Sequence, residues 1–582
     1  MTNIPDPTDR PSSAHPRRAA FGAILLLLAL LLLPDIVWLH FEHGNIRIWI
    51  SALLIPAALL ALLFAVFGNR PWIACLLLAP FAALAPLEAF YIGRYHHPTT
   101  PEILATLIAT NPREAREYLG NDLPLLALCL VAALALPLLA AWWSRRSGLR
   151  WRHDSRNWVL AILITMPPIG GIVSASRAGG DLGTRFRNGV QSVASLADFI
   201  PNGFPFGVPH RFIEYRRQWA AMRTNVARLA AYRFHARRIA NPGRRQVYVL
   251  VIGEASRRDH WQIFGYPRPT NPELSRVRNL VPIPDMDSSW PVSLTAIPMI
   301  LTRKPPTDMS IAWHEASILR TMEESGYDTW WISNQMPIGR FDSPVSTFGF
   351  EARHADFRNH ASWVSAGAYD EDLLPPLRSA LHDSKGDLFI VLHLMGSHHG
   401  YDFRYPESYR RFKPTADDAT STASLQERTR NSYDNTILYT DHVLSQVIDI
   451  LDRSGAVTAL WYESDHGEAL PTATCTLEEH GNGTRYEYEI SAFFWASDAY
   501  AAAFPARMAA LHSNAGKRTM SADTFESLID MAGLSYPGRD PSLSLFDPGW
   551  RYHPRIVNQP WQVNIDEAMI SRNCQLALPP SH

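Results

Sequence analysis

Cysteine is scarce in this chain: four occur among 582 residues and none forms a Cys-x-x-Cys pair, which excludes a zinc module built from cysteines. Neither sign of charge dominates, because the formal net charge is −1, and no overall positive field favours nucleic acid as a partner. Lysine is missing from residues 1–176, where arginine supplies the positive charge. A chain of this length exceeds one ordinary hydrophobic core, so we expect at least two domains.

Long apolar runs fill the first third of the chain. A helix needs about 20 apolar residues to cross a bilayer, and five stretches are long enough. Arg17 and Arg18 precede the first stretch, as in a signal peptide, but its long apolar run and the four later stretches favour a membrane anchor. The five predicted spans are Ala19–Leu39, Trp49–Gly68, Pro71–Ile92, Leu123–Ser144 and Trp158–Ser176.

The arginines of the short connections predict the orientation of these spans. With the N-terminus in the cytoplasm, nine arginines lie on the cytoplasmic side and four on the opposite side. Five spans then place everything after residue 176 outside the cytoplasm. Cys475 and Cys574 lie in that part, where they could form a disulfide.

Residues 177–243 are expected to link the membrane domain, 1–176, to a soluble domain, 244–582. A predicted helix near Phe212–Arg238 carries apolar residues at three-four spacing and arginines elsewhere. Beside a membrane this pattern is typical of an interfacial helix, and it fits equally a helix packed on the soluble domain with a solvated arginine face. Asn241-Pro242-Gly243 then breaks the chain.

The soluble part alternates short apolar runs with helical stretches, which predicts an α/β domain with a mainly parallel sheet between helices. In such sheets ligands bind beyond the carboxyl ends of the strands. The predicted strands are Val247–Ile252, Thr329–Ser333, Leu388–Leu394, Thr458–Tyr462 and Ile490–Trp495, and the predicted helices are Glu315–Ser325, Glu371–His382 and Ser432–Arg453.

Two of these strands end on residues that can bind a metal. Glu254 follows the first strand, and Asp465 and His466 follow the fourth. Two carboxylates and one imidazole suit Zn²⁺ or Mn²⁺ with one position left over. A capped turn would explain Asp-His-Gly-Glu alone, but its pairing with Val-Ile-Gly-Glu favours a metal site.

A fourth ligand that doubles as the nucleophile is expected, because a metal lowers the pKa of a bound hydroxyl. Ser293 and Thr295 are the candidates, in the segment Trp290–Pro298. Ser293 fits the N-cap position of a short helix, whose positive end also attracts a phosphoryl group.

Histidines follow the same strands and are candidates for contacts with phosphate or a second metal. His398 comes after the third strand, and His480 lies in a loop after Asp465 and His466. His393 and His399 are weaker candidates for the same role. A loop histidine is more often a surface residue with no function. The position of these four histidines at the edge of the sheet is what favours a functional role.

The chain resembles the phosphoethanolamine transferases of the alkaline phosphatase and sulfatase superfamily along nearly its whole length. The pattern around His393–His398 is closer to the lipopolysaccharide-core branch than to the lipid A branch. The matching segments are Glu102–Gly120, Ile252–Glu254, Gly265–Arg268, Thr270–Leu274, Trp331–Gln335, His393–His398, Tyr405-Pro406, Asn431–Asn435 and Ser464–Glu468.

The resemblance implies a five-helix transmembrane domain in a bacterial inner membrane and a sulfatase-like catalytic domain in the periplasm. It implies that zinc, as one or two ions, is bound by Glu254, Asp465, His466 and the nucleophile, with Mn²⁺ as the alternative ion. His398 and His480 would assist at the phosphate or a second zinc. The donor would be phosphatidylethanolamine, and the acceptor a lipopolysaccharide or another periplasmic glycan.

Two departures from the family matter. The family usually carries threonine as nucleophile, and alignment on Ile300-Leu301-Thr302 puts Ser293 at that position, with Thr295 two residues away. The loop around His480 reads Glu-Glu-His-Gly-Asn, unlike the usual Gly-His-Asn. Phosphoglycerol transfer on the same fold and a non-catalytic envelope scaffold are the alternatives. A sulfatase is disfavoured because Ser289–Ser293 lacks the arginine of a Cys/Ser-x-Pro-x-Arg motif.

Overall fold

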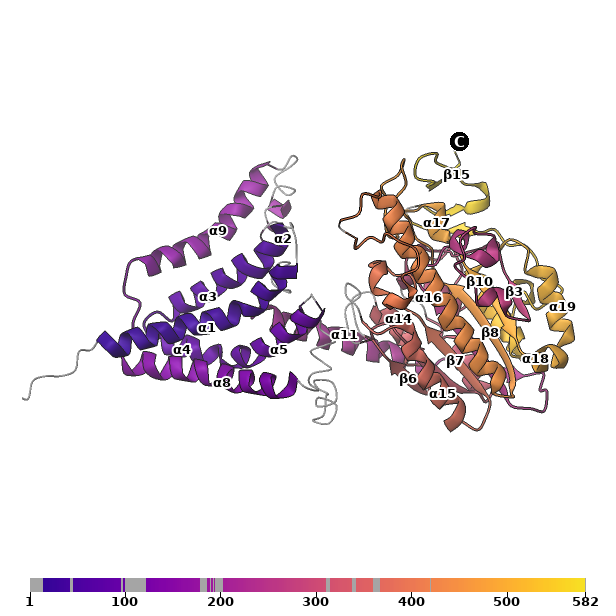
Figure 1. The fold of residues 1–582 in the computed structure, drawn as a ribbon, viewed down its shortest axis with the longest axis horizontal. Helices are drawn as coiled ribbons and strands as arrows, with labels where there is room; N and C mark the ends of the chain where they lie inside the picture. Colours follow the sequence, from indigo (N-terminus) through magenta and orange to yellow (C-terminus); the bar gives the residue numbers. More distant parts are fainter. Residues whose placement is uncertain are drawn as a thin grey trace, which may run out of the picture. The chain divides into compact units, whose positions relative to one another are not determined.

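The computed structural model describes residues 14–41, 46–95, 98–99, 122–177, 186–188, 190–191, 193, 203–309, 314–337, 342–359, 367–418, 420–559 and 561–580. The chain divides into two compact units, Met1–Arg216 and Arg217–His582, both drawn in Figure 1. The segment Glu102–Gly120, which contributed to the resemblance, lies outside the described residues.

The N-terminal unit consists of apolar helices. Pro71 opens α4, a position at which the missing N–H of proline costs nothing. The helices are α1 (Ala14–Phe41), α2 (Ile46–Trp49), the π-helical turn η1 (Ile50–Leu54), α3 (Ile55–Val66), α4 (Pro71–Leu77), α5 (Ala79–Tyr95), α8 (Leu123–Arg146) and α9 (Ser155–Arg177). Polar residues lie in the connections 67–70, between α3 and α4, and 147–154, between α8 and α9, so these apolar runs end where the sequence becomes polar.

Among the described residues, the helices α1, α8 and α9 are each long and apolar enough to cross a membrane. The helices α4 and α5 meet at a bend of 48° and would add a fourth span if they count as one. Ile50–Val66 is a shorter apolar helix. Apolar helices therefore occupy each of the five predicted segments, and the number of membrane crossings stays a prediction.

Two acidic side chains are buried inside this unit. Glu88 accepts a hydrogen bond from Arg211 at 3.0 Å and from the Thr99 hydroxyl at 2.6 Å. Asp35 accepts one from the backbone N–H of Phe204 at 2.9 Å. Buried charges need such partners, so these bonds tie residues 203–211 to the helices that carry the two carboxylates.

Helix α11 (Gly207–Ala230) begins and ends earlier than the predicted helix near Phe212–Arg238. Residues 237–238 instead form the short strand β1, which pairs with β12 (Leu534–Ser535). The part of α11 after residue 216 buries Met222 and Leu229 and places the Trp219 ring 6.2 Å from the ring of Phe350. This part of the helix therefore packs on the C-terminal unit.

The C-terminal unit is built on a seven-stranded mixed sheet with the order β3-β10-β8-β2-β7-β5-β6. β10 is antiparallel to both of its neighbours, and the other neighbouring pairs are parallel. The predicted α/β domain with a mainly parallel sheet is therefore observed. The strands are β3 (Leu280–Pro282), β10 (Ala492–Ala496), β8 (Val457–Ser464), β2 (Gln246–Gly253), β7 (Leu388–His393), β5 (Asp328–Ser333) and β6 (His354–Phe357).

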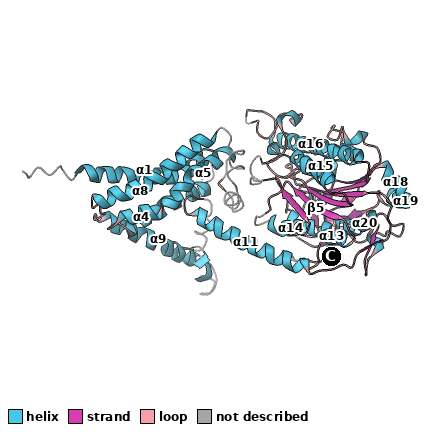
Figure 2. Ribbon diagram, turned by 90° about the horizontal axis from the view of Figure 1, so that it is seen from below, coloured by secondary structure: helices cyan, strands magenta, loops and turns pink. Residues whose placement is uncertain are grey.

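Helices cover both faces of this sheet, as Figure 2 shows. All eight residues of β2 are buried, and its side chains alternate between two cores. Tyr248, Leu250 and Ile252 join the core under α13 (Ile318–Glu324), α14 (Asp342–Gly349) and α20 (Thr524–Met531). The alternate residues Val247, Val249 and Val251 join the core under α15 (Leu374–Asp383) and α16 (Leu425–Arg453). A strand buried on both faces is uniformly apolar, which is why the sequence pattern identifies it.

The predicted strand Ile490–Trp495 is divided between two sheets. Its first part belongs to β9 (Glu489–Ile490), which pairs with β4 (Met286–Asp287). Its second part is β10 of the main sheet. Between them the N–H of Ser491 donates to the carbonyl oxygen of Ser256 at 3.0 Å, so the chain changes sheets at this residue.

Cys475 and Cys574 form a disulfide between positions 99 residues apart. It joins the loop that carries His480 to the segment between β15 (Met569–Ile570) and β16 (Ala577–Leu578). This supports the pairing that the sequence left open.

Removing this bond with the double variant Cys475→Ser/Cys574→Ser is expected to lower the free energy of unfolding by about 2–4 kcal/mol, because the bond closes a long loop in the unfolded chain. Thermal unfolding of the full chain in detergent measures the loss, and reductant should bring the wild type down to the level of the variant. Cys129→Ser, at an exposed free cysteine, is the matched control. An unchanged Tm in the double variant would contradict the prediction.

Candidate active site

The carboxyl ends of neighbouring parallel strands bring the candidate residues to one edge of the sheet. Gly253 of β2 is paired with Ser464 of β8, and Ile252 with His393 of β7. Glu254 and Asp465 directly follow β2 and β8, so they lie side by side at the end of the sheet. This edge is where ligands bind in parallel sheets.

Glu254, Asp465 and His466 form a buried group whose ligand atoms all lie within 4.8 Å of one another. Nε2 of His466 is 3.4 Å from Oε1 of Glu254 and 3.5 Å from Oδ2 of Asp465. Nδ1 of His466 is 2.7 Å from the carbonyl oxygen of Gly467. Nδ1 therefore donates its proton to that oxygen, which leaves the lone pair of Nε2 facing the two carboxylates.

This group fits a divalent cation. Oδ1 of Asp465 accepts the N–H groups of Ala255 and His466 at 3.1 and 2.7 Å, whereas its buried Oδ2 accepts no hydrogen bond from the described residues. Burial raises the pKa of Asp465 and holds the pKa of His466 well below its ordinary value. A cation would offset the cost of burying two carboxylates together, and this donor set suits Zn²⁺ or Mn²⁺.

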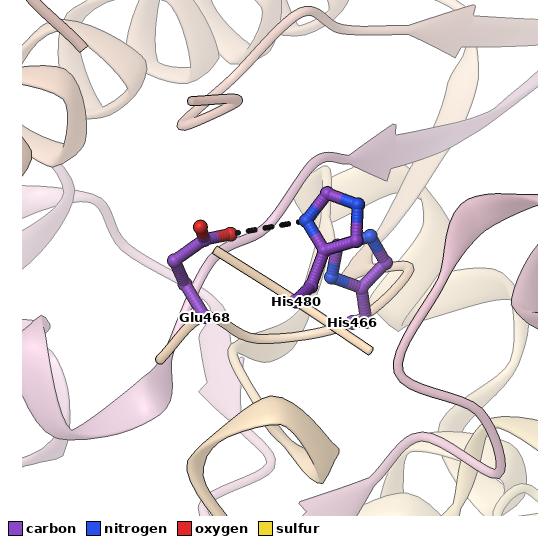
Figure 3. A group of neighbouring side chains, drawn as sticks. All are labelled: His466, Glu468 and His480. Carbon is purple, nitrogen blue, oxygen red and sulfur yellow. Dashed lines mark ion pairs between the residues drawn. The ribbon is translucent and has the colours of Figure 1, made fainter. Parts of the chain in front are cut away.

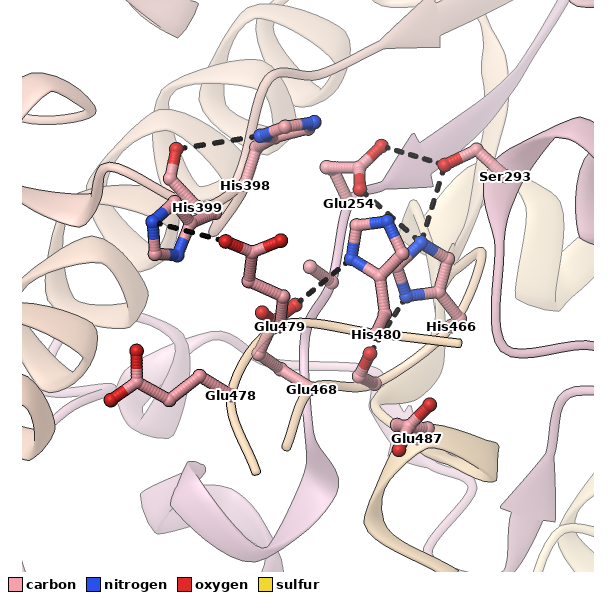
Figure 4. Close-up of polar contacts among 12 residues, drawn as sticks. Glu254, Ser293, His398, His399, His466, Glu468, Glu478, Glu479, His480 and Glu487 are labelled. Atoms are coloured by element: carbon pink, nitrogen blue, oxygen red, sulfur yellow. Dashed lines mark hydrogen bonds and ion pairs between the residues drawn. The ribbon is translucent and has the colours of Figure 1, made fainter. Parts of the chain in front are cut away.

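Ser293 points at the same group, as Figure 4 shows. Its Oγ lies 3.2 Å from Oε2 of Glu254 and 3.2 Å from Nε2 of His466. Ser293 is the first residue of α12 (Ser293–Leu301), and Val292 takes the N-cap position, so the predicted N-cap role of Ser293 is wrong by one residue. The hydroxyl still lies at the positive end of the helix, where an anionic group is favoured.

Thr295, the alternative nucleophile, lies one half-turn further along α12 and is mostly buried. Its hydroxyl donates to the carbonyl oxygen of Val292 at 3.3 Å, and its N–H donates to the same oxygen at 3.2 Å. The Ser293 hydroxyl therefore lies beside Glu254 and His466. The Thr295 hydroxyl instead bonds to the N-cap residue of its own helix.

His480 belongs to a second group of potential ligands, with His466 and Glu468 (Figure 3). Nδ1 of His480 is 3.5 Å from Oε2 of Glu468, and its ring centroid is 4.4 Å from that of His466. Burial raises the pKa of Glu468 to about 7, against the attraction of His480. Because His466 belongs to both groups, two adjacent cation positions are compatible with these residues.

The other predicted histidines line the cavity that contains Ser293. The cavity has a volume of about 450 Å³, and its lining includes His393, His398, His399 and His480. Burial lowers the pKa of His393 to about 4 and keeps the pKa of His398 well below its ordinary value. Both are therefore neutral at pH 7, and the ring of His398 lies 6.1 Å from that of His480.

Two further residues of this site, Gln335 and Glu468, were not predicted from the sequence. Nε2 of Gln335 donates to Oε2 of Glu254 at 3.3 Å and to the carbonyl oxygen of Leu394 at 3.1 Å. Glu468 faces His480, as described above. Gln335 comes just after β5, so the position rule that identified Glu254 could also have found it.

Gly396 lets the loop after β7 approach Glu254. A Cβ at this position would lie 2.9 Å from both the backbone nitrogen and the backbone oxygen of Glu254, and φ is +50°. Asp370 fixes the loop by accepting the N–H groups of Met395 and Gly396 at 2.8 and 2.9 Å. Glu254, a candidate metal ligand, is therefore held from the side opposite β8 as well.

Gly396→Ala is expected to destabilise the protein by about 1–3 kcal/mol and to weaken metal binding, because the methyl group must push the backbone of Glu254. Thermal unfolding and metal content of the purified variant measure the two effects. Gly400→Ala is the matched control, since Gly400 also has positive φ but its nearest neighbours are side-chain atoms of Phe403 and Arg404. Equal losses of metal in both variants would contradict the argument.

Comparison with known proteins identifies the class. A family model described as Sulfatase matches residues 246–534. A second, described as Phosphoethanolamine transferase EptA/EptB, matches residues 54–189. Fold, site and matches define a membrane protein that carries a sulfatase-like α/β enzyme domain.

Individual relatives show which kind of enzyme the chain resembles. The phosphoethanolamine transferase EptC of Escherichia coli strain K12 is 26% identical over 497 residues, 83% of each chain. The phosphoethanolamine transferase EptA of Escherichia coli O157:H7 is 26% identical over 80% of this chain and 83% of its own. A crystal structure of the C-terminal periplasmic domain of EcEptC from Escherichia coli, in complex with Zn, matches with a TM-score of 0.51 and 27% identity over 57% of this chain and 95% of that chain. The N-terminal part of the chain therefore matches the phosphoethanolamine transferase family model, its C-terminal part matches the Sulfatase family model, and relatives that match more than four fifths of its length are phosphoethanolamine transferases.

Proposed function

We propose that this enzyme transfers phosphoethanolamine from phosphatidylethanolamine to a lipopolysaccharide or another periplasmic glycan, with Ser293 as nucleophile. The observation that carries this proposal is the position of the Ser293 hydroxyl, 3.2 Å from both Glu254 and His466 at the start of α12. A hydroxyl held between potential metal ligands, inside a cavity, is the arrangement that covalent phosphoryl transfer needs.

Glu254, Asp465 and His466, together with Ser293, would hold one zinc, and His480 with Glu468 would contribute to a second. Bound zinc would supply positive charge that lowers the pKa of a nearby hydroxyl and balances charge on the transferring group. The zinc complex of the EptC domain from Escherichia coli supports this choice of ion.

The residues of the chain account for the two steps. The Ser293 oxygen bonds to phosphorus as the bond to the diacylglycerol oxygen breaks, and that oxygen takes a proton. The N-terminus of α12 favours the anionic phosphoryl group beside Ser293. His398 and His480 line the same cavity, so their imidazoles can bind phosphoryl oxygens and move the proton. An acceptor hydroxyl then displaces Ser293 and returns a proton to it.

We also propose that the N-terminal unit crosses a bacterial inner membrane five times and that the catalytic domain is periplasmic. Residues 46–66 are helical throughout, which is long enough for a span, and α4 with α5 gives another. The disulfide Cys475–Cys574 fits an oxidising compartment. Within residues 177–243, the exposed Phe212 and Ile213 of α11 fit an interfacial segment.

Mass spectrometry of lipopolysaccharide and other envelope glycans, from cells with and without the protein, tests the function. The expected result is a phosphoethanolamine adduct that appears only with the protein. A phosphoglycerol adduct instead would assign the other headgroup, and no adduct on any envelope glycan would contradict a transferase acting on those acceptors.

A further inference from the structure

Carboxylates are few in the cavity that contains Ser293. Among the described residues that line it, Glu254 and Glu479 are the acidic ones. Glu254 belongs to the metal-binding group and accepts hydrogen bonds from Ser293 and Gln335. Glu479 belongs to neither group of potential metal ligands. Its negative charge lies in the cavity but plays no part in the phosphoryl transfer described above.

The rest of the cavity is suited to the phosphate of a donor and leaves its amine without a partner. The N-terminus of α12, the histidines and a cation at Glu254 all favour negative charge. Apolar side chains, among them Val292, Leu294 and Met336, line other parts of the wall. A headgroup with a phosphate at one end and an ammonium at the other needs a carboxylate away from the metal ligands.

The backbone holds Glu479 firmly at this position. Its carbonyl oxygen accepts the N–H of Ala469 at 2.8 Å, in an isolated antiparallel bridge. Its φ is +64°, which is uncommon for a residue with a side chain. Oε1 of Glu479 lies 3.4 Å from Nε2 of His399, and Figure 4 shows the carboxylate turned toward that ring. About half of the side chain remains exposed, so it can accept a cation.

The neighbouring Glu478 does not face the cavity as Glu479 does. It carries the same charge one position earlier, but it is not among the residues that line the cavity. Figure 4 shows its side chain turned away from the histidines. A charge effect confined to the cavity must therefore depend on Glu479 and not on Glu478.

We propose that Glu479 binds the ammonium group of the ethanolamine headgroup and selects amine-bearing donors over neutral ones. This rests on the proposed function, because it assigns the donor's amine to a place in the same cavity. His399, whose Nε2 lies 3.4 Å from Oε1, helps to hold the carboxylate in position.

Two measurements on the full-length, metal-loaded protein in detergent micelles test the proposal. The first compares kcat/KM for phosphatidylethanolamine and phosphatidylglycerol as donors. Glu479→Gln is expected to lower the preference for phosphatidylethanolamine about tenfold, mainly through KM, as loss of one charge-assisted contact would. Glu479→Asp should recover part of the preference, and Glu478→Gln should match the wild type.

The second measurement is the affinity for the soluble headgroups phosphoethanolamine and glycerol 1-phosphate, by calorimetry. The wild type should bind phosphoethanolamine more tightly, and Glu479→Gln should abolish that difference while its zinc content and its affinity for glycerol 1-phosphate stay unchanged. A merely structural role of Glu479 would weaken both headgroups alike.

The results separate the two proposals. If the wild type uses phosphatidylethanolamine and Glu479→Gln keeps its full preference, the role of Glu479 is wrong and the proposed function stands. If the wild type transfers only phosphoglycerol, the proposed function is wrong. In that case equal binding of the two headgroups overturns the role of Glu479 as well, whereas a preference for phosphoethanolamine that depends on Glu479 supports it.

Discussion

Ser293→Ala is expected to reduce phosphoethanolamine transfer by at least about 10³-fold, which is the largest loss that any single change in this site should cause. The substitution removes the atom that forms the bond to phosphorus. It is expected to leave α12 in place, because Val292 is the N-cap residue and the Ser293 hydroxyl faces Glu254 and His466. The loss should therefore appear in kcat without unfolding the protein.

The measurement is release of labelled diacylglycerol from phosphatidylethanolamine, followed in the same samples by mass spectrometry of the intact protein. The wild type is expected to carry a phosphoethanolamine group on Ser293 when no acceptor is present, and the alanine variant to carry none. Ser293→Thr should retain much of the activity, since threonine supplies the same hydroxyl.

Thr295→Val is the discriminating variant for the alternative nucleophile. It keeps the shape of Thr295 and removes a hydroxyl that bonds to the Val292 carbonyl oxygen. Transfer that survives in Ser293→Ala and disappears in Thr295→Val would move the nucleophile to Thr295. Loss of transfer in both variants, with intact folding, would mean that the hydroxyls of both Ser293 and Thr295 are needed.

The central strands and the residues that follow them could be predicted from the sequence for a simple physical reason. β2 and β8 are buried on both faces, so they appear as continuous apolar runs. In a parallel sheet the residues after such runs meet at one edge. That rule alone predicts that Glu254, Asp465 and His466 lie together, before any distance is known.

Other features depend on contacts that a single sequence does not reveal. Among the described strands, β6 pairs with β5 alone, at the edge of the sheet, and it is partly exposed, so it lacks an apolar run. Glu468 becomes a ligand candidate because the loop that follows it brings His480 next to its carboxylate. The Cys475–Cys574 bond spans 99 residues, and only the fold brings its two ends together.

Glu254→Gln is expected to change the unfolding temperature in opposite directions with and without bound metal. Glu254→Gln is expected to lose about one bound zinc per chain, because a neutral amide replaces one of two carboxylate ligands. The metal-loaded wild type should then unfold at a higher temperature than the variant, since a ligand that binds only the folded state stabilises it by about 2.7 kcal/mol at 100 times its Kd.

After chelation the order should reverse. Glu254 and Asp465 then face each other as buried carboxylates, and the variant has one such charge fewer. Metal analysis and thermal unfolding with and without chelator measure both states, and Glu468→Gln is the matched control because it changes a buried glutamate of the second group only. A Glu254→Gln protein that keeps the wild-type zinc content, or whose Tm still falls on chelation by as much as the wild type, would contradict zinc binding at Glu254.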